Sequence, residues 1–238
     1  MRKPIFLLVT GFCFLFTVYW IPDTGYGLEA GKFYSDGSPK KAEFALTYDD
    51  GPGFITEDLL KLLERYGARA TFFMTGYSVR KYPGAAAKTA AAGHLIGNHT
   101  DKHEFYPKVG KSPDREKILA KELDGGAAAI EKATGKKTVF MRMPNGYDRD
   151  WVRKVVAGKG YIMVSWTYGS DWTAIAEDKM AAGYLSHLKP GAILLMHDGG
   201  GESRAKTLRI TEKVLLEAKK KGLKAVALDT LLDIKTGE

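Results

Sequence analysis

Short apolar segments alternate with longer helix-like segments along most of this chain of 238 residues, and this alternation restricts the fold more than any other feature. The segments with the length and composition of buried strands are residues 44–48, 70–74, 94–97, 139–141, 161–166, 192–196 and 225–228. Helix-like segments occupy residues 56–66, 84–92, 114–134, 149–158, 174–188 and 205–221. The repeated order of strand, helix and strand predicts a mostly parallel sheet in a single α/β domain, either open and doubly wound or closed into a barrel.

Some of the helix-like segments carry boundary signals. In the first one, Thr56 is expected to be the N-cap and Gly67 to follow the last turn. In the segment 114–134, Gly125 and Gly126 are expected to interrupt the helix, because glycine is unfavourable in a helix interior.

The N-terminal segment has the pattern of an export signal. Arg2 and Lys3 precede an apolar run without charges at 4–20. That run is also at the lower length limit for a helix that spans a bilayer. Two alternatives therefore stay open for residues 1–27, a signal peptide or an N-terminal membrane anchor. Either alternative predicts an exported protein that is secreted, periplasmic or membrane-anchored and faces the cell envelope.

After the leader we expect a polar linker at 28–40 and one catalytic domain at 41–238. The only cysteine, Cys13, lies in the leader, so a metal site in the exported part must use His, Asp or Glu. The net charge is +8, and removing the +1 of residues 1–27 leaves +7. Outside the cytoplasm such a surface favours anionic wall polymers or phospholipid headgroups over nucleic acid, and simple solvation of a basic surface is the alternative.

Polar residues follow several predicted strands, at the edge where parallel α/β sheets place their chemistry. They are Asp49, Asp50, His99, His103, Arg142, Asp171 and His197. Asp49 and Asp50 are adjacent carboxylates before Gly51 and Pro52, so one can bind a metal while the other stays free, although an ordinary turn has the same composition.

The spacing of His99 and His103 would let both imidazoles point the same way on a helical turn and share one cation. Two histidines and one carboxylate leave coordination positions open, which is typical of catalytic metal sites. His94 and His187 do not follow a strand in this way, and we expect them to be structural or exposed.

Five short motifs occur in a fixed order along the chain. They are Thr47-Tyr48-Asp49-Asp50-Gly51-Pro52, His99-Thr100-Asp101-Lys102-His103, Arg142-Met143-Pro144-Asn145-Gly146, Asp171-Trp172 and Leu195-Met196-His197. In this order they resemble the motifs of the polysaccharide deacetylases, carbohydrate esterase family four with its nodulation-deacetylase homology domain, over residues 41–235. The resemblance implies a distorted (β/α) barrel of seven or eight mostly parallel strands, a divalent cation and a hydrolytic reaction.

The resemblance also implies a role for each matching residue. Asp50, His99 and His103 match the metal ligands, Asp49 the general base, Arg142 the arginine that orients this base, His197 the general acid, Asp171 its carboxylate partner, Asn145 the backbone donor to the oxyanion, and Trp172 and Leu195 the apolar walls around the acetyl group. The chain departs from the family at Asn145, where an aromatic residue is usual, and at Tyr168, where another polar residue is often found.

The implied activity is hydrolysis of N-acetyl groups on an N-acetylhexosamine polymer, with peptidoglycan or a related envelope glycan ahead of chitin oligomers. Zn²⁺ is the expected cation, and Co²⁺ or another divalent ion is possible. The alternatives are an O-acetyl polysaccharide esterase, a catalytically silent glycan-binding domain, and a basic scaffold without a site. The oligomeric state does not follow from the sequence.

Overall fold

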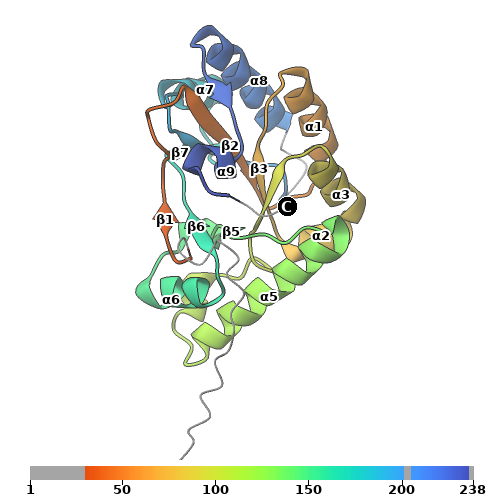
Figure 1. Cartoon of the computed structure of the whole chain (residues 1–238), viewed down its shortest axis with the longest axis vertical. Helices are drawn as coiled ribbons and strands as arrows, with labels where there is room; N and C mark the ends of the chain where they lie inside the picture. The colour runs from red at the N-terminus through yellow and green to blue at the C-terminus, as the bar shows by residue number, and fades with distance from the viewer. Residues whose placement is uncertain (1–29, 201–204, 236–238) are drawn as a thin grey trace, which may run out of the picture.

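The computed structural model describes residues 30–200 and 205–235, and the strand pairs in this part of the chain are parallel. Within this part, nine strands form one sheet in the order β1-β6-β5-β4-β3-β2-β8-β7, with β9 paired to β2. Figure 1 shows the strands at the centre of the molecule, with α7 and α8 towards one end and α5 and α6 towards the other. The fold class predicted from the sequence is confirmed.

The strands are β1 (Phe33–Tyr34), β2 (Glu43–Asp49), β3 (Thr71–Met74), β4 (Leu95–Asn98), β5 (Phe140–Met141), β6 (Ile162–Val164), β7 (Tyr168–Gly169), β8 (Ile193–His197) and β9 (Lys224–Ala225). The helices are α1 (Thr56–Arg65), α2 (Gly76–Lys81), α3 (Pro83–Ala91), α4 (Tyr106–Val109), α5 (Arg115–Thr134), the 3₁₀ turn η1 (Pro144–Gly146), α6 (Asp150–Gly158), α7 (Glu177–Ser186), α8 (Ala205–Lys220) and α9 (Leu228–Leu232).

One stretch of chain gives the sheet its barrel form. The fifth predicted strand, 161–166, is present as β6, and a further strand that was not predicted, β7, follows directly after it. The strand β6 pairs with β5, whereas β7 pairs with β8. Between them the Thr167 N–H donates to the carbonyl of Ile193 at 2.8 Å. Because β5 and β8 stand far apart in the strand order, this stretch joins the two sides of the sheet. The alternative left open by the sequence is thereby decided in favour of a distorted barrel.

The alternation of side chains along β2 divides the core into two layers. Leu46 and Tyr48 belong to the cluster between the sheet and the helices, together with Leu59 of α1. Ala45 belongs to the cluster inside the barrel, with Phe73 of β3. Successive side chains of a strand point to opposite faces. The side chain of Asp49 therefore lies on the interior face, at the carboxyl end of the strand.

A short strand lies in the segment where the sequence predicts a linker. Phe33 and Tyr34 of β1 pair with Met163 and Val164 of β6. Two residues without regular alternation carry no strand signal in the sequence. The expected leader at 1–27 lies outside the described residues, and among the residues that are described no helix is long and apolar enough to cross a membrane.

Two expectations about helix boundaries are wrong. Thr56 is the first residue of α1 rather than its N-cap, and its hydroxyl donates to Oδ2 of Asp198 at 2.6 Å. The helix α5 runs through Gly125 and Gly126 without a break. A Cβ at Gly126 would lie 2.4 Å from Oδ1 of Asn98 and 2.9 Å from the carbonyl oxygen of Thr100. The glycine lets the loop after β4 pack directly on the helix. Gly67 does follow the end of α1, with a left-handed φ of 59°.

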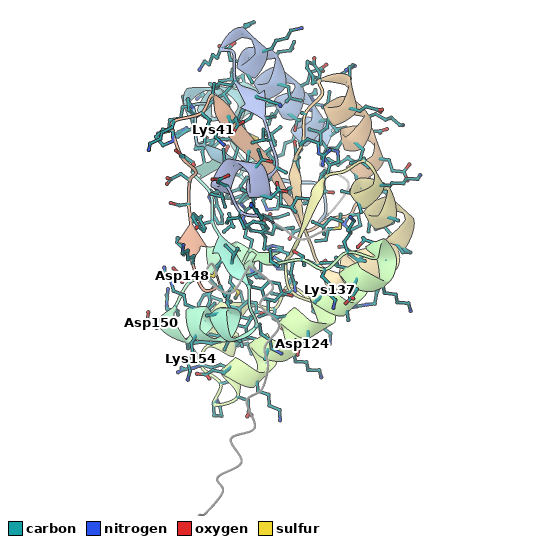
Figure 2. The ribbon with its side chains drawn as sticks, in the orientation of Figure 1. Lys41, Asp124, Lys137, Asp148, Asp150 and Lys154 are labelled. Carbon is teal, nitrogen blue, oxygen red and sulfur yellow. The ribbon has the colours of Figure 1, made fainter. Side chains whose placement is uncertain are left out.

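Ion pairs between exposed side chains join the outer helices. Figure 2 shows Asp124 on α5 and Lys154 on the neighbouring α6. Lys159, just after α6, contacts Asp124 at 2.7 Å, and Lys154 lies 3.8 Å from Glu116 of α5. Exposed pairs of this kind contribute about 0 to 1 kcal/mol each, so the apolar layers rather than these pairs hold the helices in place.

Candidate active site

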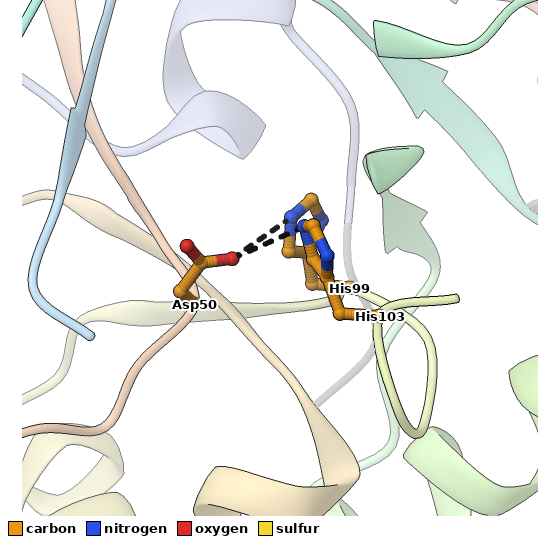
Figure 3. Close-up of side chains that lie close together, drawn as sticks. All are labelled: Asp50, His99 and His103. Carbon is orange, nitrogen blue, oxygen red and sulfur yellow. Dashed lines mark ion pairs between the residues drawn. The ribbon is translucent and has the colours of Figure 1, made fainter. Parts of the chain in front are cut away.

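Asp50, His99 and His103 meet beyond the carboxyl ends of β2 and β4 (Figure 3). The Nε2 atom of His99 lies 3.5 Å from Oδ1 of Asp50, and Nε2 of His103 lies 3.4 Å from the same oxygen. One donor atom from each residue lies within 4.8 Å of the others. These three residues are called the donor group below, and the structure places them as a group that could hold a metal ion.

Left-handed backbone conformations build this group. The φ angles of Asp50, Thr100 and His103 are 69°, 67° and 58°. The expectation that His99 and His103 share a helical turn is wrong, because the chain after β4 is a loop. The Thr100 N–H donates to Oδ1 of Asn98 at 2.9 Å and tightens this loop. The loop still brings the two rings to 5.1 Å between centroids.

The donor group has the features of a metal site. The Nδ1 atom of His99 lies 2.7 Å from the main-chain oxygen of Arg142, so Nδ1 carries the proton and Nε2 is left to accept a cation. Oδ1 of Asp50 is buried and accepts no hydrogen bond from the residues that the structure describes. Tetrahedral ligands at zinc distances of about 2.0–2.2 Å lie about 3.4 Å apart, which agrees with the observed separations. These residues therefore fit a divalent cation.

The charges around the donor group favour ligation. Burial alone would raise the pKa of Asp50, but the imidazoles of His99, His197 and His103 outweigh it and hold that pKa well below its usual range. Burial lowers the pKa of His103, and the neighbouring His99 lowers it further. Burial opposes the charge on His99, but the carboxylates of Asp49 and Asp50 raise its pKa overall. An ionised carboxylate beside imidazoles is the form in which these groups bind a metal, and binding displaces any imidazolium proton.

Asp49 is held by an arginine from across the barrel. Its side chain is buried, and Nη1 of Arg142 donates to its Oδ1 at 2.8 Å. The same nitrogen donates to Oγ1 of Thr47 at 2.8 Å, and the guanidinium also donates to two main-chain carbonyls at the end of β6. Oδ2 of Asp49 faces the donor group, 3.8 Å from Nε2 of His99. One carboxylate oxygen is thus fixed by the arginine while the other is directed at the metal-type site.

His197 and Asp171 form a second, separately supported pair. The Nδ1 atom of His197 lies 2.7 Å from Oδ1 of Asp171, and the His197 N–H donates to Oδ2 at 2.8 Å. Thr207 of α8 donates to the same Oδ2 at 3.0 Å. Burial lowers the pKa of His197, but the bond to Asp171 outweighs burial, and the net pKa is raised. His197 is the register partner of Asp49 on the adjacent strand, so this pair borders the donor group.

The remaining predicted residues lie on the same rim. The Trp172 ring is half exposed and makes an edge contact with the His197 ring, with 5.3 Å between ring centroids. Leu195 is buried on β8, two residues before His197. Asn145 lies on η1 with a left-handed φ of 54°, a conformation that asparagine tolerates. Among the described residues, no hydrogen bond joins the Asn145 side chain to the donor group.

Several supporting residues were not predicted. Tyr184 of α7 accepts hydrogen bonds from the N–H groups of Ser170 and Asp171 and donates to the Leu195 carbonyl at 2.6 Å. Thr47 shares the interior face of β2 with Asp49, so strand alternation is the signal that could have found it. No local signal points to Tyr184, because its partners are 11 to 14 residues away and the contact depends on how α7 packs.

Asp198 is a buried carboxyl without a predicted role. Its Oδ2 accepts the hydrogen bond from Thr56, and its Oδ1 has no partner in the described part of the chain. Burial raises its pKa to about 7. A Cβ at Gly51 would lie 2.2 Å from Oδ1 of Asp198, so the glycine of the first motif gives this carboxyl its space.

The two histidines set aside in the sequence are structural. His94 is buried, and its Nδ1 accepts the N–H of Ala70 at 3.2 Å. Burial, with a contribution from Arg69, lowers the pKa of His94 to about 4, so this ring is neutral. His187 stacks on Tyr168 at 4.2 Å, away from the donor group.

A carboxylate and two imidazoles beside a buried carboxylate and an imidazole–carboxylate pair, on the rim of a parallel (β/α) barrel, are the arrangement of a metal-dependent hydrolase. Residues 36–164 match the family model for polysaccharide deacetylase. The chain belongs to this family.

Relatives and solved structures agree with this assignment. The chain is 35% identical over 195 residues to a peptidoglycan-N-acetylglucosamine deacetylase of Bacillus cereus, covering 80% of this chain and 88% of that protein. A crystal structure of a peptidoglycan N-acetylglucosamine deacetylase in complex with a naphthalenyl N-oxidanyl-benzamide superposes with a TM-score of 0.79 at 26% identity, covering 92% of this chain and 100% of the other. A pseudoenzyme of carbohydrate esterase family four from Bacillus anthracis superposes with a TM-score of 0.74 at 25% identity, covering 87% and 71%.

Proposed function

We propose that this protein is a metal-dependent N-deacetylase that hydrolyses acetamido groups of an N-acetylhexosamine polymer. The observation that carries the proposal is the meeting of three units on one rim: the donor group, the Asp49–Arg142 pair and the His197–Asp171 pair. A site that only binds glycan needs no buried carboxylate held by arginine beside metal-type donors. The combination is required for activating water and protonating a leaving group.

Asp50, His99 and His103 are the proposed ligands, and zinc is the proposed cation, with Co²⁺ or another divalent ion as a substitute. Zinc accepts imidazole and carboxylate donors and leaves positions open in catalytic sites. When bound there, such a cation supplies Lewis-acid chemistry, which lowers the pKa of water to about 7 and polarises a carbonyl. The chain itself has to supply the groups that move protons.

Asp49 is the proposed general base. Nη1 of Arg142 donates to Oδ1 of Asp49 at 2.8 Å and fixes the carboxylate, so Oδ2 is left to take a proton from the attacking water. A planar guanidinium suits this task because it fixes the carboxylate and stays charged even when buried. The backbone N–H of Asn145 is the proposed donor to the oxyanion that forms on the acetyl carbonyl.

His197 is the proposed general acid. An amine leaves poorly unless it is protonated as the C–N bond breaks. Asp171 bonds Nδ1 of His197 at 2.7 Å, which raises the pKa of the ring and directs Nε2 towards the reaction centre. Trp172 and Leu195 are the proposed walls of the space for the acetyl methyl group.

The proposed substrate is peptidoglycan or a related envelope glycan, ahead of chitin oligomers. The related deacetylase from Bacillus cereus, the basic net charge of +8 and the signal-like pattern at 1–27 support this order. The same features support a proposed location outside the cytoplasm, either secreted or anchored at the envelope. An O-acetyl esterase would use the same groups, and a silent glycan-binding domain resembles the pseudoenzyme among the structural neighbours.

The deciding experiment incubates the purified, zinc-loaded protein with peptidoglycan, chitin oligomers and O-acetylated xylan, and follows the loss of acetyl groups by mass spectrometry. Deacetylation of the first two substrates supports the proposal. Release of acetate from xylan alone would indicate an esterase. Stoichiometric metal without turnover on any of the three would indicate a silent binding domain, and protein without bound metal would indicate a scaffold.

A further inference from the structure

A groove next to the donor group carries aromatic and basic side chains that the mechanism above does not use. It encloses about 360 Å³, and both Asp50 and His103 lie in its wall. Its other walls come from the loop before α1, from α2 and from the loop after β4. A ligand bound here would therefore lie beside the donor group.

Three aromatic rings line this groove. Phe54 and Tyr77 are 66% and 61% exposed, and Tyr82 packs against Phe54 with 5.9 Å between ring centroids. Large apolar side chains gathered in a hollow mark a ligand groove, because a monomer gains nothing from exposing them. Ring faces with polar tips suit the faces of sugar rings, which are apolar in the middle and polar at the edge.

Two lysines line the groove as well. Lys81 holds its ammonium 5.2 Å from the centre of the Tyr82 ring, and Lys102 lies inside the second motif, directly before His103. Neither ammonium has an ion pair within the described parts of the chain. The neighbouring carboxylate of Asp101 is engaged by Arg80 at 2.6 Å.

Within the described residues, the groove therefore presents two ammonium groups that no ion pair engages. Among its described lining residues Asp50 is the one acidic side chain, and this residue belongs to the donor group. A neutral polymer such as chitin offers these ammonium groups hydrogen-bond acceptors but no ionic contact. A glycan that carries an acid beside the acetylated sugar would gain from both.

We propose that this groove is a subsite that selects glycans with a carboxylate next to the sugar that is deacetylated, with Lys81 and Lys102 contacting the carboxylate and Phe54 and Tyr77 stacking on the sugars. The inference rests on the proposed function and narrows its substrate to acidic glycans. In peptidoglycan the carboxylate has two sources, the lactyl group of muramic acid and the acids of the stem peptide. Both present the same chemistry to the lysines.

The test measures kcat/KM of the zinc-loaded, full-length protein on three substrates: chitopentaose, glycan strands with free lactyl groups after removal of the peptides, and strands that retain their peptides. The ratio of kcat/KM on an acidic strand to that on chitopentaose is the readout. We expect the double variant Lys81→Gln/Lys102→Gln to lower this ratio by about three- to tenfold, as expected for two partly exposed charge contacts. The strand type that shows the larger drop identifies the source of the carboxylate.

Three further variants complete the test. Lys132→Gln removes an exposed lysine of α5 that does not line the groove, and it should leave the ratio as in the wild type. Lys81→Arg/Lys102→Arg keeps both charges and should keep most of the selectivity. Phe54→Ala should raise KM on all three substrates by a similar factor, because stacking does not depend on the substrate charge.

The outcomes separate this inference from the proposed function. A double glutamine variant with the same ratio as Lys132→Gln overturns the subsite while leaving the deacetylase intact. A wild type with no preference for either acidic strand over chitopentaose overturns it too. Wild-type protein that removes no acetyl group from any of the three substrates in the presence of zinc overturns the proposed function, and the subsite with it.

Discussion

The donor group stands on the loops after β2 and β4, whereas His197 is the last residue of β8 and Asp171 lies in the turn after the neighbouring β7. Oδ1 of Asp50 is buried without a hydrogen-bond partner in the described residues, and His103 is one-third exposed. Both oxygens of Asp171 accept hydrogen bonds, and Asp171 is fully buried. The donor group is left incomplete by the protein and is suited to an external cation, while the pair is complete in itself.

This difference has a consequence for mutations. Removing a member of the donor group takes away a ligand but breaks few internal contacts, so binding should suffer more than folding. Removing Asp171 leaves the buried N–H of His197 without an acceptor, which costs about 1 to 3 kcal/mol of folding free energy. Mutations in the donor group should therefore reduce metal binding without a large loss of stability, whereas mutations of Asp171 should reduce both activity and stability.

The largest effect should come from removing the metal. We expect chelation to reduce deacetylation to background, and Zn²⁺ or Co²⁺ to restore it. The variant Asp50→Asn should lose stoichiometric metal as measured by elemental analysis, while its thermal unfolding without metal stays near that of the wild type. Full activity of metal-free protein would contradict the assignment of the donor group.

Asp49 lies between the two units and tests whether binding and chemistry are separate. We expect Asp49→Asn to keep its metal and to lower turnover by about 10² to 10⁴, the range for loss of a general base. The matched measurement is metal content on the same protein sample. Loss of the cation in this variant would make Asp49 a ligand and Asp50 the free carboxylate.

The variant His197→Ala tests the role of the His197–Asp171 pair by comparing substrates whose leaving groups differ in their need for a proton. Turnover of an N-acetyl substrate should fall by about 10² or more, because the departing amine needs a proton. Turnover of an activated O-acetyl ester should fall much less, since its leaving group needs little protonation. Equal losses on both substrates, with unchanged metal content and folding, would assign His197 to positioning or to oxyanion stabilisation.

Asp171→Asn should give a milder loss and a shift in pH dependence. Asp171 raises the pKa of His197, so the acid form persists to higher pH in the wild type. Without this carboxylate the pKa falls, and the alkaline limb of kcat should move to lower pH. The stability that the raised pKa contributes is present below the unfolded-state pKa of histidine and is lost as pH rises through the folded-state pKa. An unchanged alkaline limb would show that His197 is not the titrating acid.

The smallest effect should come from the packing of α5 against the loop after β4, which carries His99 and His103. A Cβ in Gly126→Ala would press on Asn98 and on the loop backbone, so we expect a loss of about 1 to 3 kcal/mol of stability and weaker metal binding. Gly158→Ala, at the end of α6, meets open space and should raise stability by about 0.4 to 1 kcal/mol. Urea unfolding with and without zinc measures both. Equal stability of the two variants would show that the loop yields to the extra methyl group.

Most strands could be predicted because their apolar runs are short and bounded, and the candidate site residues could be named because they lie in short motifs along the chain. The additional strand β7 after β6 could not be predicted, because its two residues carry no alternation pattern and its pairing with β8 depends on the tertiary structure. The helix through Gly125 and Gly126 was predicted wrongly for a related reason. The cost of glycine in a helix is local, but the contact with the loop at Asn98 that offsets it is not.

The sequence by itself determined the α/β class, the family and the order in which the reactive residues follow the strands, since these depend on local periodicity and on motif spacing. Only the tertiary structure decided how those residues meet. It set the left-handed loop that turns His103 back towards Asp50, the arginine that crosses the barrel to Asp49, and the tyrosine of α7 that supports Asp171. Each of these contacts joins segments that are adjacent only after the sheet has curved, because hydrogen bonds and ion pairs act over a few ångströms and carry no signal along the chain.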